Sequence, residues 1–135
     1  MDHKQLLNYL KDEIKNIEGT YVEYDESSVM LSVPVEDMRF QNVKVYLEDR
    51  EEKLKISFIS KICSLDEYKS QDFHGLLVKN HSFDYARLII HDNAIQVYAS
   101  EVYERASFDH CRDIFMEVAN EADKMEMEFT GEDIN

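Results

Sequence analysis

The feature that most constrains the fold of this chain is an alternation of apolar and polar residues in its centre. Val43, Val45 and Leu47 alternate with their neighbours, and so do Leu54, Ile56 and Phe58 in a second segment that runs on to Ile62. A period of two is typical of a β-strand whose two faces differ. The charged run at 48–52 separates the segments and predicts a hairpin loop. Residues 84–91 and 94–102 are also expected to be strands, joined by the turn dipeptide Asp92-Asn93, so both pairs are expected to be antiparallel.

Helical periodicity marks both ends of the chain. Apolar residues recur at helical spacing over about 3–18, and Gly19 follows at a position typical of a C-terminal cap. A longer helix is expected after Ser107, its N-cap. Its apolar stripe is spaced alternately by three and four residues: Phe108, Cys111, Phe115, Val118, Ala122, Met125 and Phe129. The acidic residues beside the stripe are interpreted as a solvated face: Glu117, Glu121, Asp123, Glu126 and Glu128.

The remaining segments complete the expected order of elements. Short strands are expected over 20–24 and 29–33, an irregular stretch over 35–41, and a frayed tail over 130–135. Ser64, with Glu67 as its capping-box partner, predicts one or two short helical turns across 64–80. The order is α-β-β-β-β-α-β-β-α. We therefore predict one α+β domain, 1–135, in which a single antiparallel sheet has the N-terminal and long C-terminal helices packed on one face.

Composition narrows the classes of function. The chain has 135 residues, with 15 Lys and Arg against 29 Asp and Glu, and a net charge of −14. Because an acidic surface repels phosphate backbones, we expect no nucleic-acid partner. The N-terminus has no apolar core of a signal peptide, and no apolar run is long enough to span a membrane. Cys63 and Cys111 are the only cysteines, which favours buried, reduced thiols and a cytoplasmic location.

The sequence carries no motif for catalysis or for a cofactor. The five histidines, at positions 3, 74, 81, 91 and 110, form no zinc-binding pattern. His110 and Cys111 are adjacent on a helix, so their side chains point about 100° apart. With only three glycines, the chain has no phosphate-binding loop. We therefore expect no enzyme activity, no metal and no bound nucleotide, and a small enzyme with an unrecognised site is the least favoured alternative.

The central strands are apolar on both faces. The residues expected to face the helices are Val43, Val45, Leu47, Leu54, Ile56, Phe58, Ala86, Leu88, Ile90, Ile95 and Val97. A second set would then point outward: Tyr46, Ile59, Tyr85, Ile89 and Tyr98. Because contiguous apolar patches mark interaction sites, we predict that this set binds protein. The alternative is that tyrosine is present only for its preference for strands.

Three stretches carry a resemblance to a known family. Residues 83–98, FDYARLIIHDNAIQVY, resemble the last hairpin of the type III secretion chaperone-like fold, which includes Tir-chaperone-type secretion chaperones and YbjN-type bacterial proteins. Residues 6–10 resemble its opening helix, and residues 76–80, LLVKN, resemble the end of its middle helix. The resemblance covers nearly the whole chain. It implies a binding role without chemistry, and it favours a homodimer.

Two functions from different classes follow from these observations. The first is a noncatalytic protein-binding module, chaperone- or adaptor-like, that holds a protein partner by strand addition and by the apolar patch. The alternative is an acidic immunity or inhibitor protein that neutralises a basic toxin or nuclease. Binding by charge alone weakens strongly with salt, whereas strand addition changes little. The patch, or the neighbouring segment 64–80, is expected to form the homodimer or the partner interface.

Overall fold

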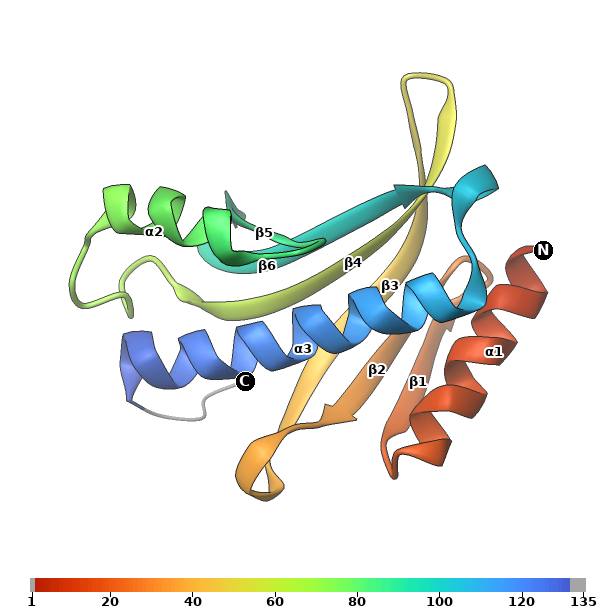
Figure 1. Cartoon of the computed structure of the whole chain (residues 1–135), viewed down its shortest axis with the longest axis horizontal. Helices are drawn as coiled ribbons and strands as arrows, with labels where there is room; N and C mark the ends of the chain where they lie inside the picture. Colours follow the sequence, from red (N-terminus) through yellow and green to blue (C-terminus); the bar gives the residue numbers. More distant parts are fainter. Residues whose placement is uncertain (1, 132–135) are drawn as a thin grey trace.

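A six-stranded antiparallel sheet and three α-helices form the computed structural model, which describes residues 2–131. The strand order is β1-β2-β3-β4-β6-β5 (Figure 1). The elements are α1 (His3–Asn16), β1 (Thr20–Asp25), β2 (Ser28–Pro34), η1 (Glu36–Met38), β3 (Phe40–Arg50), β4 (Lys53–Ser64), α2 (Phe73–Lys79), η2 (Asn80–Ser82), β5 (Arg87–His91), β6 (Ala94–Val102), η3 (Tyr103–Arg105) and α3 (Phe108–Thr130). The predicted α+β class and the predicted order of elements are confirmed.

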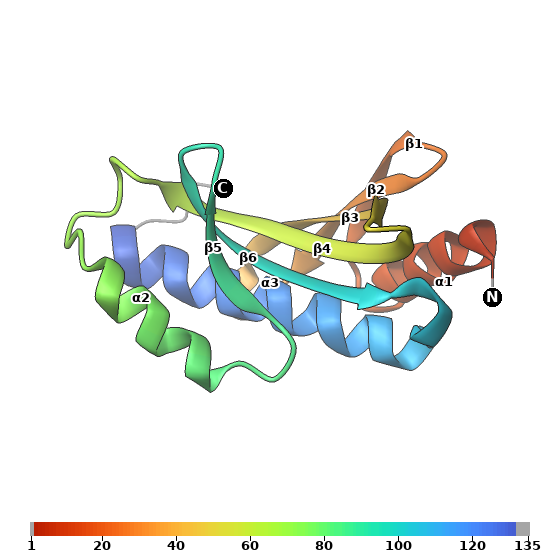
Figure 2. The ribbon, with the colours of Figure 1, turned by 90° about the horizontal axis from the view of Figure 1, so that it is seen from above.

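The helices lie on one side of the sheet, as the view from above shows (Figure 2). Helix α3 contacts β3, β4 and β6, helix α1 contacts β1 and β2, and helix α2 contacts edge strand β5. The apolar core fills the space between α1, α3 and the sheet, and it includes Phe58, Phe115 and Leu10, which have no exposed surface. None of the described helices covers the opposite face of the sheet, which we call the open face.

The first helix ends before the glycine that the sequence suggests as its cap. Helix α1 begins with a capping box between Asp2 and Gln5, and its C-cap is Ile17. The positive φ that reverses the chain, 65°, belongs to Glu18. Gly19 is needed for a different reason, because a Cβ there would lie 2.5 Å from the carbonyl oxygen of Ser32. This glycine lets the start of β1 approach β2 closely.

The central hairpin is longer than the alternation indicates. Strands β3 and β4 pair from Lys44 with Ile59 out to Arg50 with Lys53, so the expected loop at 48–52 reduces to a two-residue turn. Its residues Glu51 and Glu52 have φ values of 50° and 67°, as a type I′ turn requires. The charged residues there continue the strand ladder because their backbones pair regardless of side-chain charge. The expected turn at 92–93 is confirmed, with both φ values positive.

Strand β5 begins later than predicted because a carboxylate accepts hydrogen bonds from the backbone N–H groups just before it. The side chain of Glu117 in α3 accepts hydrogen bonds from the backbone N–H groups of Asp84 (2.9 Å), Tyr85 (2.8 Å) and Ala86 (2.7 Å). These three groups would otherwise be available to a strand ladder. The strand that the sequence places at 84–91 therefore starts at Arg87.

The capping box at Ser64 forms but does not start the helix. Ser64 N–H donates to Glu67 (2.8 Å) and Glu67 N–H donates to the Ser64 hydroxyl (3.2 Å). These bonds close a turn at the end of β4. Helix α2 begins later, with Asp72 as its N-cap accepting from Gly75 N–H. The helical region predicted across 64–80 is thus one short α-helix followed by a 3₁₀ turn.

The stripe on α3 is buried as predicted, with one exception. Phe108 is 36% exposed and stacks on Tyr9 of α1 with ring centroids 4.5 Å apart. Cys63 and Cys111 are free and buried, as expected. Burial raises the pKa of the Cys63 thiol to about 11 and that of Cys111 to about 12, so both stay protonated near neutrality.

The interpretation of the acidic residues on α3 as one solvated face is wrong. Asp123 and Glu126 are 3% and 0% exposed. Asp123 receives two hydrogen bonds from the Arg39 guanidinium, Nε to Oδ1 at 2.9 Å and a terminal nitrogen to Oδ2 at 2.7 Å. The pair joins the segment before β3 to the middle of α3. Glu117 also has a partner, in the segment before β5.

The predicted frayed tail starts one residue too early, because Thr130 is still helical and its hydroxyl donates to the carbonyl oxygen of Glu126. Gly131, with φ 77°, caps α3. Residues 132–135 lie outside the described residues. Within residues 2–131, no helix combines the length and the apolar run needed to cross a membrane.

Candidate protein-binding surfaces

The open face is defined by the pairing registers of the sheet. Residues directly opposite each other on neighbouring antiparallel strands point to the same side. One row of such residues crosses all six strands in the order β1, β2, β3, β4, β6, β5: Val22, Met30, Lys44, Ile59, Tyr98 and Arg87. The helix-facing residues Val45 and Phe58 alternate with this row.

Four of the five predicted binding residues share the open face. Ile59 lies opposite Tyr98, Tyr46 lies one pair further along β3, and Ile89 lies opposite Gln96 at the edge. Tyr46, Ile59 and Ile89 are partly exposed. The structure therefore brings four of the five residues onto one face of the sheet.

Tyr85 lies apart from this patch. It precedes β5, its N–H donates to Glu117, and its ring meets the edge of His110 with centroids 5.2 Å apart. A strand beginning at residue 84 would have placed Tyr85 on the same face as Arg87, but no strand forms there. Tyr85 is 43% exposed at the side of α3.

Tyr98 lies on the open face but is only 4% exposed. The guanidinium of Arg87 lies 4.7 Å from the centroid of its ring, and that of Arg50 lies 5.8 Å away. Its hydroxyl donates to Glu48 (2.9 Å), which also accepts from the Ser57 hydroxyl (2.6 Å). Tyr98 is therefore a buried anchor below two arginines rather than an exposed apolar surface.

The groups around Glu48 favour the ionised form of its carboxylate. Burial raises the pKa of Glu48, but the hydrogen bonds from Ser57 and Tyr98, with Arg50 nearby, outweigh this effect and hold the pKa below its ordinary value. Burial, with the negative charge of Glu48, raises the pKa of Tyr46 to about 12. The centre of the open face thus holds one ionised acid among neutral tyrosines at neutral pH.

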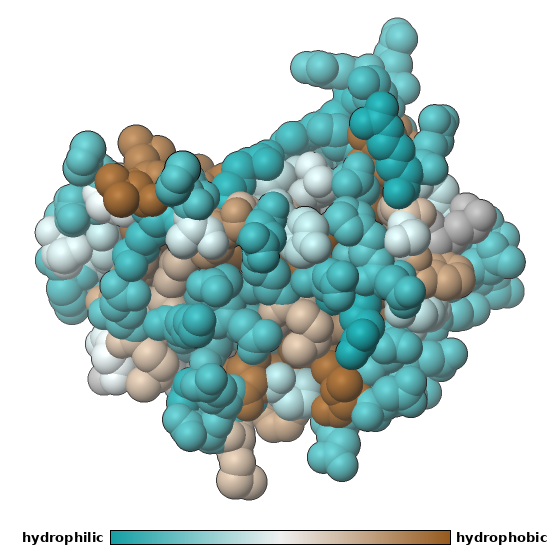
Figure 3. Space-filling view, in the orientation of Figure 1, coloured by the Kyte–Doolittle hydropathy of each residue, from teal (hydrophilic) through white to brown (hydrophobic). Residues whose placement is uncertain are grey.

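A second surface lies where α2 meets the edge strand β5. An apolar groove of about 260 Å³ is lined there by Phe73, Leu76, Leu77, Asn80, Leu88, Ile89 and Ile90. Leu77, Val78 and Ile90 are 71%, 61% and 53% exposed. In the space-filling view, hydrophobic residues gather over α2 at the upper left, and further hydrophobic patches lie elsewhere on this largely hydrophilic face (Figure 3). The prediction that Ile90 belongs to the core is wrong, because α3 does not cover the edge strand β5.

The sequence contains a signal for this second surface. Leu76, Leu77 and Val78 are consecutive, and three consecutive positions cannot share one face of a helix. Since α2 buries Leu76, the other two side chains must face elsewhere.

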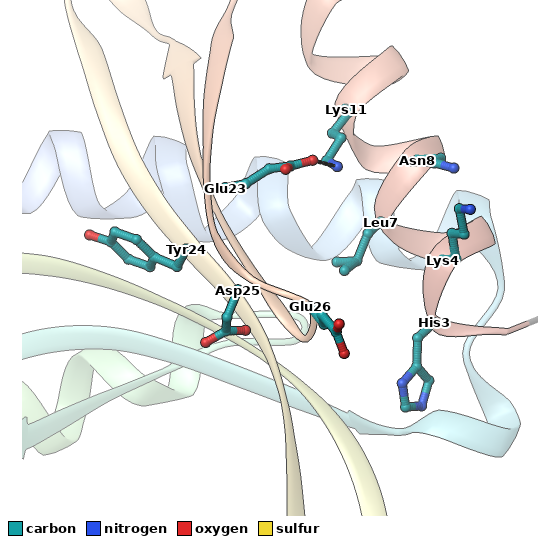
Figure 4. A pocket seen from close by; sticks show the side chains of 9 residues that line it. All are labelled: His3, Lys4, Leu7, Asn8, Lys11, Glu23, Tyr24, Asp25 and Glu26. Carbon is teal, nitrogen blue, oxygen red and sulfur yellow. Dashed lines mark hydrogen bonds and ion pairs between the residues drawn. The ribbon is translucent and has the colours of Figure 1, made fainter.

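A pocket of about 790 Å³ lies between α1 and the β1–β2 hairpin (Figure 4). Most of the residues that line it are polar or charged, and the Lys11 ammonium pairs with the carboxylate of Glu23. Leu7 is the one apolar aliphatic side chain among the lining residues.

The histidines and cysteines do not converge. His110 lies 3.2 Å from the carboxylate of Glu101, whereas Cys111 is buried on the core side of α3. Among residues 2–131, no group of three or more His, Cys, Asp or Glu side chains is placed to hold a metal ion.

Comparison with known proteins gives one informative result. No protein-family model matches the chain, and no curated protein matches it in sequence. The structure is similar to a chain of a solved structure described as "Crystal Structure of the ExsC-ExsE Complex", with a TM-score of 0.67 and 16% sequence identity. The match covers 96% of this chain and 98% of that chain. At this sequence identity the similarity shows that the two chains share a fold, and it does not bear on a YbjN-type assignment.

Proposed function

We propose that this chain is a single-domain, noncatalytic protein-binding module, chaperone- or adaptor-like, that acts in the cytoplasm. It holds a protein partner on the open face and pairs with a second copy through the groove between α2 and β5. The observation that carries the proposal is the open face itself, a sheet surface without a helical cover whose centre holds Tyr46 and Ile59. The similar solved structure is, by its description, a complex of two proteins.

The open face is suited to a protein segment because it combines apolar side chains with rigid anchors. Ile59 and Ile89 offer apolar surface, and each could contribute about 1.5–3 kcal/mol when fully buried, before ordering costs. Tyr98 is already fixed by Glu48 and Arg87, so little side-chain order would have to be gained on binding.

The α2–β5 edge is suited to self-association. Within the described sheet, strand β5 pairs with β6 alone, but its other edge is partly occupied, because the Asn80 side chain accepts from Leu88 N–H (2.5 Å) and donates to the Leu88 carbonyl oxygen (3.5 Å). Self-association therefore rests on the apolar side chains beside this edge. Leu77 and Ile90 are exposed beside that edge, and solvent-exposed apolar clusters are uncommon on a stable monomer. Two copies related by a twofold axis would bury both clusters at once.

Selection of peptides from a random displayed library on the purified chain tests partner binding. We expect enriched sequences whose binding is lost when Tyr46 and Ile59 are both replaced by serine. The matched control is Met38→Ser with Met127→Ser, which removes two exposed apolar side chains outside both proposed surfaces. Failure to enrich any sequence above background contradicts the proposed binding function.

Sedimentation tests self-association. We expect a species of twice the 16.0 kDa chain mass at micromolar concentration, and we expect Leu77→Ser with Ile90→Ser to return it to one chain mass. Met38→Ser, which changes a side chain that is 95% exposed elsewhere, is the control. A wild-type chain that sediments as a monomer at high micromolar concentration contradicts the dimer.

A further inference from the structure

The open face is basic, although the chain as a whole is strongly acidic. The strand positions on this face include two acidic residues, Asp25 and Glu48, and six basic residues: Lys44, Arg50, Lys53, Lys55, Lys61 and Arg87. Six positive charges and two negative charges give +4. Since the chain carries −14, the remainder carries −18. The open face is therefore basic, whereas the rest of the chain is strongly acidic.

Most of these bases have no acidic partner. Within residues 2–131, no ion pair engages Lys44, Lys55, Lys61 or Arg87, although the chain holds almost twice as many acids as bases. Lys44 instead lies over the rings of Tyr24 (5.3 Å) and Tyr46 (5.5 Å). These charges are held in place by the sheet and are free to pair with another molecule.

We infer that the open face binds an extended, acidic segment of a partner protein, whose carboxylates pair with Lys44 and Arg87 while an apolar side chain between them packs on Ile59. This inference rests on the proposed function and adds the chemical class of the partner. The argument is charge complementarity on a face that already carries the apolar centre of the binding patch.

The row of residues across the sheet sets the spacing of the segment. Lys44 on β3 and Arg87 on β5 are separated by the strands β4 and β6, which corresponds to about 14 Å at the usual spacing between strands. An extended peptide advances about 14 Å in four residues. Acidic residues at positions i and i+4 would thus reach the two bases. The residue at i+2 points to the same side and would lie over Ile59 and Tyr98.

The charge distribution disfavours the other occupants of this face. A twofold contact between two open faces would place +4 against +4, so a second copy does not fit here. A nucleic acid carries about one charge per 1.7 Å over its whole length and would also meet the acidic remainder of the chain. A short acidic segment meets only the basic face.

Fluorescence anisotropy with defined peptides tests the inference. The probe is a labelled peptide with Glu at every fourth residue, Leu midway between them and Ser elsewhere, and its partners are the same peptide with Gln or with Lys in place of Glu. We expect the Glu probe to bind the intact chain at least about tenfold more tightly than the Gln probe at low salt, with the difference shrinking as salt screens the charges.

Charge reversal at two positions locates the site. Lys44→Glu with Arg87→Glu should weaken binding of the Glu probe at least about tenfold. The matched control, Lys69→Glu with Lys124→Glu, makes the same change in net charge off the face and should alter binding less than about twofold. Lys44→Gln with Arg87→Gln removes the two charges without reversing them and should weaken binding of the Glu probe by an intermediate amount. Thermal unfolding of this variant shows whether it still folds, so a loss of charge can be told apart from a loss of structure.

Three outcomes overturn the inference. They are equal binding of the Glu and Gln probes, equal losses in the two reversed pairs, and tighter binding of the Lys probe or of a single-stranded oligothymidylate than of the Glu probe. If the displayed library yields neutral peptides whose binding depends on Ile59, an acidic partner is excluded but the proposed binding function stands. If that library yields nothing, the proposed function itself fails.

Discussion

The two faces of the sheet are built from the same strands and differ in almost every other respect. Val45 and Phe58 face the helices and have no exposed surface, whereas their sequence neighbours Tyr46 and Ile59 face outward and remain partly exposed. The helix-facing side is stabilised by apolar packing under α3. The open face is stabilised by the polar cluster around Glu48 and by arginines over Tyr98.

The comparison shows where stability and recognition reside in this molecule. Replacing a side chain packed under α3 with a smaller one would leave a cavity, so this side of the sheet stabilises the fold. The lysines of the open face have no ion pair within the described residues, so they are available for binding. The following changes test this division, from the largest expected effect to the smallest.

Phe115→Ala should give the largest loss, because Phe115 is fully buried between α3 and the sheet. We expect the free energy of unfolding to fall by about 3–5 kcal/mol, from lost apolar burial and the cavity left behind. Phe108→Ala, on the same helix but 36% exposed, should cost less than about 1.5 kcal/mol. Urea denaturation of both variants measures the difference, and equal losses would remove the distinction between core and surface.

Asp123→Ala should be the next most damaging change. It leaves the Arg39 guanidinium, whose side chain is 19% exposed, without its two charge-assisted hydrogen bonds. We expect a loss of about 2–3 kcal/mol. Asp37→Asn removes the exposed partner of the same arginine, at 3.3 Å, and should cost less than about 0.5 kcal/mol. A denaturation midpoint that shifts equally in both variants would show that burial of the pair is unimportant.

Glu48→Gln tests the open-face cluster and its dependence on pH. The folded pKa of Glu48 is lowered from its ordinary value of 4.5, so its ionised form stabilises the fold above that value, and this stability is lost as pH falls through the folded pKa. We expect the variant to lose about 1–2 kcal/mol at pH 7. The difference from wild type should shrink below pH 4.5. A difference that is constant from pH 7 to pH 3 would contradict the assignment, and exposed Glu52→Gln serves as the control.

Lys55→Gln with Lys61→Gln should have the smallest effect on stability. Neither side chain has an ion pair within the described part of the chain, so we expect a change in the free energy of unfolding of less than about 0.5 kcal/mol. Thermal unfolding measures it. A loss above about 1.5 kcal/mol would show that the basic face is needed for folding rather than kept for binding.

Local patterns in the sequence carry most of the fold. The alternation around Val45 and Phe58, the type I′ turn at Asp92 and the spacing along α3 all reflect contacts between near neighbours, which the chain specifies wherever it lies. The same patterns place Tyr46, Ile59 and Tyr98 together, because antiparallel pairing conserves the side to which residues point.

Long-range contacts determine the features of the fold that the local patterns do not. Arg39 meets Asp123 across 84 positions, Glu117 ends strand β5 early by binding the backbone before it, and Arg87 covers the ring of Tyr98. These contacts depend on the register of the sheet and on the place of α3 across it, and no local period encodes either. The sequence by itself therefore determined which residues form strands, helices and turns. Only the tertiary structure decided which polar side chains are buried and which face of the sheet stays open, because both depend on groups brought together from distant parts of the chain.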